Sequence, residues 1–562
     1  MNQLKKSKIR LPIILLLALW ACGDKEPAPV SVAPSAVIQV EGDVNLPVGG
    51  SVTLTATVEN AIHPVYSWTV NGQVISNSLT YRFTGDQVGD FFINFRVDAD
   101  NGNDEKQIKL TVANKVPPAL SAPSACIVYA GTDRLLTVEA KNAANAAYEW
   151  RLNNELVSTD NTYTFRQTAA GIYTLNVKLT TAGGSDQKTI TVTVVTAVAE
   201  LYFDDGRYRT ATNVAQRRKM TVPLGKSLVL TPVICHIEHP ATFQWLVDGV
   251  SQSSTTEFLT FTPPAMGTYL ISVTEQTTSA TAEVEVECTA AEGTYLREKT
   301  DANKASAAIA MEYIPAPGQF INYPTGTTPE QGVQDLQAWL DDGSTYFHAG
   351  AYGGYFIAGF DHSVRNVEGK ADLQIRGNPI PSWCEPGVVW VMQDDNGNGL
   401  PDDTWYELRG SETGKSETKQ RYAVTYFKPA NANADVLWAD NRGQTGSIDR
   451  LIYHQQPYYY PMFVEGDQYT LTGTGLASAT SLNGTTEVSP CFSWGYVDNI
   501  SSGNPDRADG ALFWIEDAVQ ADGTAANLQY IDFVKVQTAA TGKAVASGDV
   551  STEAYPPVDL NF

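Results

Sequence analysis

A turn rich in acidic and amide side chains, Asp394 to Asp403, is the segment whose residue types point most directly to chemistry. Oxygen-bearing side chains recur at alternate positions, and glycine stands where a looped cation site must turn sharply. Clustered carboxylates repel one another, and a hard divalent cation would remove that repulsion. The sequence therefore predicts a structural Ca2+ in this turn. Its predicted ligands are Asp394, Asn396, Asn398, Asp402 and Asp403, with the backbone carbonyl of Leu400.

Two alternatives to calcium stay open for this turn. Position twelve of a looped calcium site is normally a bidentate glutamate, but here it is Trp405, so Asp403, Glu407 or water would have to close the shell. An acidic surface hairpin without metal is one alternative, and a catalytic role is the other.

An aromatic stretch, YHQQPYYYPMF from Tyr453, could meet a ligand. Tyrosine and tryptophan rings stack on flat ligand faces and carry a polar end. The prolines in the stretch argue against a central strand and favour a loop or an edge. The alternative is a tyrosine-rich strand packed in the core. The predicted ligand-binding residues are Tyr453, His454, Tyr458, Tyr459, Tyr460 and Trp383.

The sequence offers no established catalytic motif: it has no G-x-S-x-G, no H-E-x-x-H, no glycine-rich phosphate loop and no C-x-x-C. His348 and His362 could face each other or a metal, although two such histidines are more often structural. An acid pair such as Asp361 with Glu385 or Glu516 would be an arbitrary choice in so acidic a chain. We therefore expect no catalytic residues and no enzyme activity, with a cryptic hydrolase as the alternative.

Three internal repeats precede these residues in the chain. Each repeat has a tryptophan before a short turn, then a glycine 21 or 22 residues later, then an aromatic residue two places on. Period-two alternation, as in SVTLTATV and YTLNVKL, indicates short strands, and such strands with frequent turns favour small β-sandwiches. The predicted repeats are residues 37–115, 116–196 and 197–290, with Trp68, Trp150 and Trp245 as core residues and Gly89, Gly171 and Gly267 in turns.

Residues 291–562 form a different, non-repeating region that is rich in Trp, Tyr, Gly, Asn and Asp. Helical spacing of apolar residues is present at TPEQGVQDLQAWLDD, through Val333, Leu336, Trp339 and Leu340. The rest reads as strands and long loops. The predicted fold is therefore all-β: three tandem Ig/PKD-like β-sandwiches followed by a larger jelly-roll-type β-sandwich that carries the ligand site.

The charge balance is strongly acidic, with a formal net charge of −24. Removing the first 21 residues, which carry four basic and no acidic side chains, would give −24 − 4 = −28. Such a chain repels nucleic acid and anionic lipid, and it has no basic stripe to offset this. Nucleic acid is therefore excluded as a partner.

The first 22 residues combine a basic start, an apolar run from Leu11 to Trp20 and a small residue before Cys22. This is the pattern of a secretory signal, and its end resembles a bacterial lipobox. We expect a signal peptide at 1–21, lipidation at Cys22 and a Pro- and Ala-rich tether at 22–36. The acidic start of the tether resembles an export tag to the outer face of the outer membrane. An ordinary secretory signal and a periplasmic location are the alternatives.

Five cysteines remain after Cys22. Cys235 could pair with Cys288, and Cys384 with Cys491, while Cys126 is left over. Five buried free thiols is an equally good interpretation.

The W…GxY pattern of the repeats resembles PKD and related immunoglobulin-like modules of bacterial surface proteins, which most often act as spacers. The motifs GGYFIAGFDHSV, EPGVVWVMQDDNGNGLPDDTWYELRGSE and LQYIDFVKVQT resemble the C-terminal domain of secreted bacterial "cell surface proteins". That second resemblance implies a jelly-roll sandwich similar to discoidin-like binding domains, without catalysis.

Lipoproteins with this combination resemble accessory proteins of TonB-dependent uptake systems, for corrinoids such as vitamin B12 or for glycans. The resemblance implies a surface-exposed, lipid-anchored outer-membrane protein that binds a nutrient. Its implied partners are the membrane, through the anchor, a corrinoid as the favoured ligand, and a TonB-dependent transporter. A glycan-binding accessory and a structural or adhesive surface protein are the alternatives.

Overall fold

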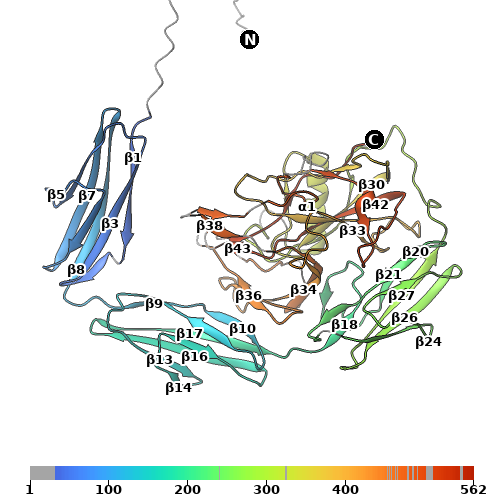
Figure 1. Cartoon of the computed structure of the whole chain (residues 1–562), viewed down its shortest axis with the longest axis horizontal. Helices are drawn as coiled ribbons and strands as arrows, with labels where there is room; N and C mark the ends of the chain where they lie inside the picture. Colours follow the sequence, from blue (N-terminus) through green and yellow to red (C-terminus); the bar gives the residue numbers. More distant parts are fainter. Residues whose placement is uncertain are drawn as a thin grey trace, which may run out of the picture. The chain divides into compact units, whose positions relative to one another are not determined.

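The structure, a computed structural model, describes residues 32–562 except 43, 239–240, 323–325, 452–453, 455, 457, 463, 465, 478–479, 484–485, 490, 502–510 and 545–547. The predicted signal, Cys22 and most of the tether lie outside these residues. Over the described residues the chain is nearly all β, which confirms the predicted fold class (Figure 1). It divides into two compact units: one holds the first sandwich with Ala140–Ala146 and Leu179–Asp186, and the other holds the rest of the chain from Leu120, including the last domain.

The first sandwich packs two sheets around Trp68, whose side chain is fully buried and lies 4.8 Å from the ring of Phe95. One sheet has the order β1 (Ser35–Glu41), β3 (Ser51–Glu59), β6 (Thr80–Thr84). The other has the order β2 (Asn45–Pro47), β8 (Gly102–Ala113), β7 (Gly89–Ala99), β4 (Val65–Val70), β5 (Gln73–Ser76).

The second sandwich repeats this plan around the fully buried Trp150. Its main sheet has the order β10 (Ala125–Tyr129), β17 (Gly184–Val195), β16 (Gly171–Thr181), β13 (Ala147–Leu152), β14 (Glu155–Ser158). Two short pairs complete it: β11 (Arg134–Thr137) with β15 (Thr162–Phe165), and β9 (Ala119–Ser121) with β12 (Glu139–Lys141).

The third sandwich is built around the fully buried Trp245. Its main sheet has the order β20 (Arg218–Pro223), β27 (Thr281–Thr289), β26 (Gly267–Glu275), β23 (Phe243–Val247), β24 (Val250–Ser251). The pairs β21 (Leu228–Leu230) with β25 (Leu259–Phe261) and β18 (Glu200–Tyr202) with β22 (Val233–Cys235) complete it. In each repeat the predicted tryptophan is the core residue, as expected.

The C-terminal domain packs two antiparallel sheets face to face. The first has the order β28 (Ile309–Ile314), β30 (Tyr355–Arg365), β42 (Tyr530–Thr538), β32 (Gly387–Met392), β33 (Tyr406–Leu408), β41 (Ala518–Val519). The second has the order β19 (Arg209–Thr210), β37 (Gln468–Gly475), β34 (Lys419–Phe427), β35 (Val436–Asp440), β36 (Thr445–Ile448). The core between them is rich in tyrosine, including Tyr355, Tyr426 and Tyr469.

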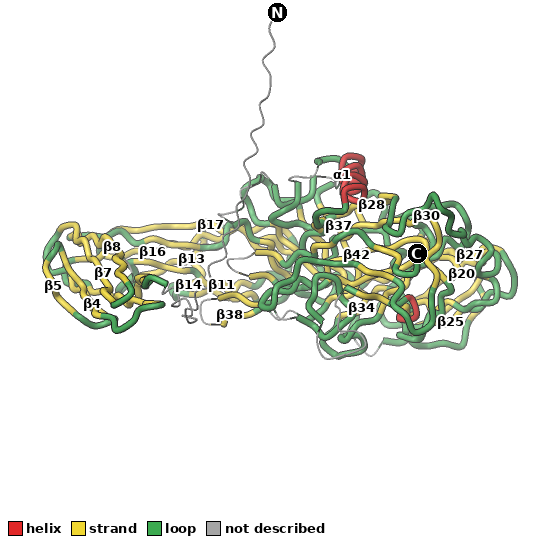
Figure 2. Tube along the Cα trace, turned by 90° about the horizontal axis from the view of Figure 1, so that it is seen from above, coloured by secondary structure: helices red, strands yellow, loops and turns green. Residues whose placement is uncertain are grey.

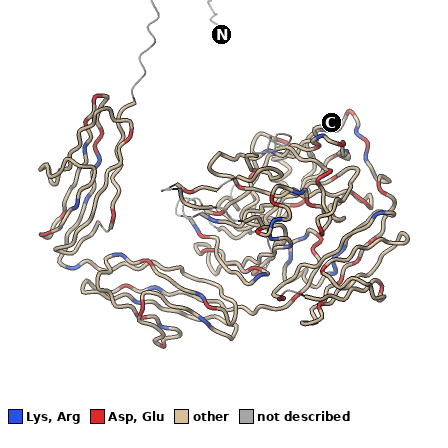
Figure 3. Tube along the Cα trace, viewed as in Figure 1, with Lys and Arg blue, Asp and Glu red and all other residues tan. Residues whose placement is uncertain are grey.

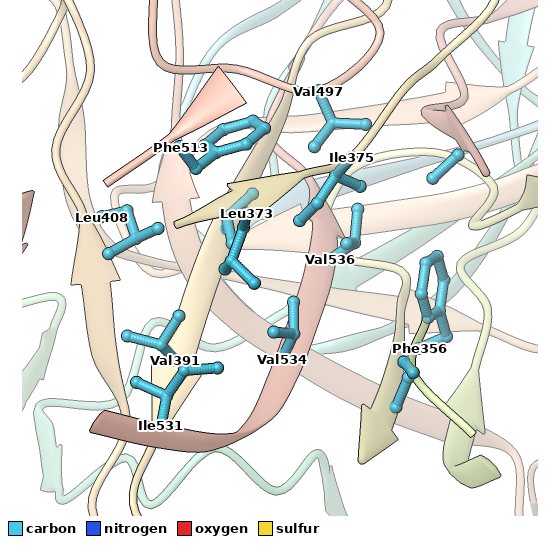
Figure 4. Packing of buried hydrophobic residues seen from close by; sticks show 14 of the residues in the cluster. Phe356, Leu373, Ile375, Val391, Leu408, Val497, Phe513, Ile531, Val534 and Val536 are labelled. Carbon is cyan, nitrogen blue, oxygen red and sulfur yellow. The ribbon is translucent and has the colours of Figure 1, made fainter. Parts of the chain in front are cut away.

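The outer face of the six-stranded sheet is buried as well. It is covered by the α-helix α1 (Pro329–Asp342) and by a small sheet of order β40 (Leu512–Phe513), β31 (Leu373–Gln374), β46 (Val558–Asp559). Figure 4 shows the core under the small sheet, with Leu373 and Phe513 facing Val534 and Val536 of β42. Because both faces of the six-stranded sheet are covered, every residue of β42 is buried.

Helix α1 lies at the predicted place (Figure 2). Thr328 caps its N-terminus, and Gly343 ends it in a left-handed conformation with φ 61°. Leu336, Trp339 and Leu340 are buried, as their spacing predicts. Gln337 ties the helix to the chain at β28 by bonding Ala308 and Ala310.

The remaining elements are short: the 3-10 turn η2 (Ile515–Asp517) and the strand pairs β29 (Phe347–His348) with β45 (Glu553–Ala554), β38 (Ser481–Asn483) with β39 (Thr486–Val488), and β43 (Lys543–Ala544) with β44 (Gly548–Asp549). Basic residues are scattered along the chain among the more numerous acidic ones (Figure 3). No helix in the described part of the chain is long and apolar enough to span a bilayer.

Candidate functional site

The third sandwich is joined to the C-terminal domain rather than separated from it. The edge strand β19, from the start of the third repeat, pairs with β37, with Arg209 opposite Thr470. Tyr202 and Thr472 share a hydrogen bond of 2.8 Å between their hydroxyls, and the Asn441 amide donates to the carbonyl of Ile234 at 2.9 Å. The third repeat therefore supplies an edge strand to the next domain.

A pocket of about 330 Å³ lies at this junction. We call it the junction pocket. Leu228, Leu230 and Phe258 of the third sandwich line one side, and Trp390, Trp405 and Arg421 of the C-terminal domain line the other. Gln420, Gln520 and Asp522 add polar groups. Apolar walls with a few polar groups are the usual composition of a small-molecule site, and this volume lies at the low end of their range.

Trp405 is held in place by the third sandwich. Its indole lies against Gly206, where an added Cβ would come within 2.5 Å of the ring atom Cδ1. Gly206 also has φ +86°, a conformation that other residues rarely adopt. One wall of the pocket therefore depends on glycine at this position.

The acidic turn leads directly into that wall. The carboxylate of Asp394 accepts the backbone N–H groups of Gly397, Asn398 and Gly399 at 2.8 to 3.1 Å. The amide of Asn398 donates to Asp402, and that of Asn396 donates to Asp403. The side chains of these predicted ligands are thus hydrogen-bonded within one loop, and Thr404 and Trp405 follow it into the pocket lining.

The donor set of this loop fits calcium, since carboxylate, amide and carbonyl oxygens are the ligands that a hard cation prefers. Leu400, whose carbonyl is a predicted ligand, has an exposed side chain, and Asp402 is exposed too. Calcium binding here stays a prediction. If bound, the ion would stiffen the loop that carries Trp405.

The other end of the loop is buried against the third sandwich. Asp395 accepts a hydrogen bond from the hydroxyl of Thr221 at 3.2 Å, and the hydroxyl of Thr404 donates to the carbonyl of Thr221 at 2.6 Å. Burial, with Asp395 nearby, raises the pKa of Asp403 to about 8. The loop is therefore tied to both domains that form the pocket.

The predicted aromatic ligand surface is corrected by the structure. Tyr459 and Tyr460 are each 1% exposed and belong to the core between the two large sheets. Their rings are covered because the segment packs beside Tyr469, so the alternative of core tyrosines holds for these two. Tyr458 is half-buried and donates to the carbonyl of Pro429. Tyr453 lies outside the described residues.

The other two predicted ligand residues lie near a second group of polar side chains. His454 packs edge-on against Phe320, which stacks on His348. Trp383 is half-buried and bonds to Glu385. Neither of these two residues lines the junction pocket.

That second group consists of Glu385, Asp498 and Glu553. Among the residues that the structure describes, these are the only three His, Cys, Asp or Glu side chains whose ligand atoms all lie within 4.8 Å of one another. Nδ1 of His348 lies 2.7 Å from Glu553. Burial raises the pKa of Asp498 to about 8, and the neighbouring Glu553 adds to the shift. Sequence reasoning found Glu385 alone, because the three acids are far apart in the chain.

The structure also assigns roles to His362, the second of the two histidines considered as metal ligands, and to the cysteines. His362 is 1% exposed and is hydrogen-bonded between Asp361 and Asp559 at 2.9 and 3.0 Å, a structural role. Cys384 and Cys491 form a disulfide, one of the two pairs left open by the sequence. The other pair is not formed, because Cys235 and Cys288 are buried free thiols, as is Cys126.

Comparison with known proteins identifies one sequence family. Residues 39–99 match a PKD-like domain, which supports the predicted PKD/Ig-like repeats. This match covers the first sandwich only. No curated protein matches the chain.

Solved structures of multi-domain fragments, several of them tandem immunoglobulin domains, match part of the chain. Three domains of the outer capsid protein Hoc of bacteriophage RB49 are 15% identical and cover 46% of this chain and 100% of theirs, with a TM-score of 0.16. The I-band fragment I67–I69 of titin is 12% identical over 46% and 98%, with a TM-score of 0.15. The Ig1–2 module of Drosophila receptor protein tyrosine phosphatase DLAR is 14% identical over 29% and 100%, with a TM-score of 0.14. At these TM-scores the likenesses carry no argument about function.

Proposed function

We propose that the third sandwich and the C-terminal domain together bind a small nutrient molecule in the junction pocket. The observation that carries this proposal is the pocket itself, whose walls come from both domains: the C-terminal domain contributes two tryptophans, and the third sandwich contributes Leu228, Leu230 and Phe258. The acidic turn, loaded with calcium, would position Trp405 as one wall. The first two sandwiches would act as spacers.

The composition of the pocket favours a glycan over a corrinoid as the ligand. Trp390 and Trp405 offer aromatic faces, and Gln420, Gln520 and Arg421 offer hydrogen-bonding groups. A sugar ring has an apolar face and a rim of hydroxyls, so it matches both kinds of group. A corrinoid is much larger than the molecules that a volume of about 330 Å³ encloses, and only a part of it would enter.

The cellular setting is part of the same proposal. A lipid on Cys22 would anchor the protein to the outer membrane with the sandwiches facing outward. A TonB-dependent transporter would receive the ligand. No catalytic step is proposed, because ligand capture needs none.

Calorimetry on the chain from residue 32 onward tests the proposal, with a panel of oligosaccharides and with cyanocobalamin, in calcium and in chelator. Two variants remove pocket walls from opposite domains, Phe258→Ala and Trp390→Ala. Trp438→Ala is the matched control, because Trp438 is half-buried in the C-terminal domain but does not line the junction pocket.

We expect an oligosaccharide to bind the natural chain and the control, and to bind both pocket variants at least tenfold more weakly. Binding that survives both substitutions would overturn the pocket as the site. Tight binding of cyanocobalamin alone would replace the glycan with the corrinoid. Absence of binding to either class by the folded chain would favour the structural or adhesive alternative.

A further inference from the structure

A buried lysine lies behind the junction pocket. Lys535 is on β42, at the centre of the six-stranded sheet, and only 3% of it is exposed. Its ammonium lies 4.4 Å from the centre of the Tyr355 ring and less than 6 Å from those of Trp390 and Trp405. A buried cation is costly unless polar groups or rings compensate it.

The described residues offer this ammonium fewer hydrogen-bond acceptors than it has N–H donors. It has three N–H donors, and one of them bonds to the carbonyl of Gly206 at 3.1 Å. Within the described part of the chain no carboxylate lies within 4.0 Å of it. The nearest acids hold other partners: Glu312 accepts from the Tyr355 hydroxyl, and Asp204 accepts from the N–H of Gly206.

Space is present beside the ammonium. A chamber of about 50 Å³ is lined by Lys535, Asp204, Asp205 and Asp403, together with Met220 and the two tryptophans. Asp204, Met220, Trp390, Thr404 and Trp405 line both this inner chamber and the junction pocket. Such a volume holds a water molecule or a small substituent of a ligand.

The charges around the inner chamber restrict what can enter it. A carboxylate or phosphate would place its oxygens against the side-chain oxygens of Asp204 and Asp403, and an ammonium group would meet Lys535. Asp205 is already paired, with Arg207 and Arg218. A hydroxyl can accept from an ammonium and donate to a carboxylate at the same time. A neutral, hydroxyl-bearing arm is therefore the group that fits.

We propose that Lys535 and Asp204 are the specificity-determining residues of the junction pocket, and that they bind a hydroxyl on a short arm of the ligand, such as the hydroxymethyl group of a hexose. Lys535 donates to this hydroxyl and Asp204 accepts from it, while Trp390 and Trp405 flank the ring that carries the arm. This inference rests on the proposed function.

The test compares methyl hexosides with their 6-deoxy counterparts, using the gluco, galacto and manno pairs as probes. Binding is measured by calorimetry for the chain from residue 32 onward. Lys535→Met removes the charge and keeps the length of the side chain, and Asp204→Asn removes the accepting carboxylate. Lys543→Met is the control, because Lys543 is an exposed lysine paired with Asp449.

We expect the natural chain and the control to bind at least one hexoside at least tenfold more tightly than its 6-deoxy counterpart, because a site built to bond a hydroxyl rejects the analogue that lacks it. Lys535→Met and Asp204→Asn should lose this preference and bind the two members of each pair with similar affinity. Thermal unfolding of each variant shows that it is folded. If Lys535→Met does not fold, Asp204→Asn alone decides the outcome.

Three results would overturn the inference. Equal binding of both members of every pair by the natural chain would mean that the inner chamber holds only water, and would leave the proposed function intact. A preference retained by both variants would assign it to other residues. If no member of any pair binds the natural chain, the glycan proposal and this inference both fall.

Discussion

The hydroxyl of Thr404 donates to the carbonyl of Thr221 at 2.6 Å, and the N–H of Thr221 donates back to that hydroxyl at 2.9 Å. Both residues are buried. One side chain thus satisfies both backbone groups of a residue in the neighbouring domain, at the point where the acidic turn enters the pocket wall.

Replacing Thr404 by valine leaves these two buried backbone groups without the hydroxyl. We expect the free energy of unfolding to fall by about 1 to 3 kcal/mol, as for other buried groups that lose a partner. Thr268→Val, on an exposed face of β26, should change it by less than about 0.5 kcal/mol. Chemical denaturation measures both, and equal effects would contradict the prediction.

Gly206→Ala should disturb the wall formed by Trp405. The added Cβ would lie 2.5 Å from the indole, at a backbone conformation of φ +86°. Gly225 gives a matched control, because it has φ +89° and no atom within 4 Å of an added Cβ. Both variants should lose about 1 kcal/mol to backbone strain, and Gly206→Ala should lose at least about 1 kcal/mol more and change the tryptophan fluorescence. Indistinguishable variants would mean that Trp405 moves away freely.

Asp402→Ala separates calcium binding from simple loop packing. Asp402 is exposed, and the amides of Asn396 and Asn398 are its hydrogen-bond donors. In chelator the substitution should therefore cost less than about 0.5 kcal/mol. In calcium the natural chain should gain about 2 to 3 kcal/mol at a hundredfold excess over Kd, and the variant should not.

Thermal unfolding in both buffers measures this difference, with Asp301→Ala, a change at an exposed acid elsewhere, as the control. A midpoint of the natural chain that is the same in calcium and in chelator would refute the metal site.

The disulfide between Cys384 and Cys491 closes a sequence separation of 107 residues. Replacing both by serine should lower the free energy of unfolding by about 2 to 4 kcal/mol. Alkylation of the unfolded, unreduced chain from residue 32 onward should label Cys126, Cys235 and Cys288 and no other cysteine. Mass spectrometry reads the labels, and five labelled cysteines would contradict the bridge.

Stability should depend on pH through Glu385 and Asp498. Burial raises the pKa of Glu385 well above its ordinary value, and Asp498 adds to the shift. A carboxyl whose pKa is raised in the folded protein keeps its proton there while the unfolded chain loses it, so the free energy of unfolding falls as pH rises from about 5 to about 8. Glu385→Gln should make this fall smaller.

Denaturation at several pH values in chelator measures the slope. Glu298→Gln, at a residue whose side chain is 72% exposed, is the control and should leave it unchanged. The same slope in Glu385→Gln as in the natural chain would show that other groups carry the dependence.

The sequence predicted what local patterns encode. Period-two alternation and the spaced Trp68, Trp150 and Trp245 gave the three sandwiches, because each core forms within one repeat. Helix α1 followed from the helical spacing of its apolar residues, and the structure adds the caps Thr328 and Gly343. These features need no information from distant parts of the chain.

The site was only partly predictable. The spacing of its residues predicted the acidic turn. The adjoining pocket could not be predicted, because it is lined by Phe258 of one domain and by Trp390 and Trp405 of another. Lys535 gave no signal, since one lysine in an apolar strand resembles a solvent-facing position of an edge strand. The prediction of a binding surface failed at Tyr459 and Tyr460, because a tyrosine-rich stretch is typical of a binding surface but these two side chains are buried in the core.

The pairing of β19 with β37 also determines the smallest C-terminal fragment of this chain that gene recombination can transfer to another protein. A gene fragment that begins at residue 291 would encode the large sandwich with one edge of its five-stranded sheet stripped bare, and open sheet edges recruit other chains. Recombination that preserves solubility must therefore cut the gene before Glu200. We expect the third repeat and the last domain to have been inherited together as one unit. The first repeat can be lost or duplicated without exposing this sheet edge.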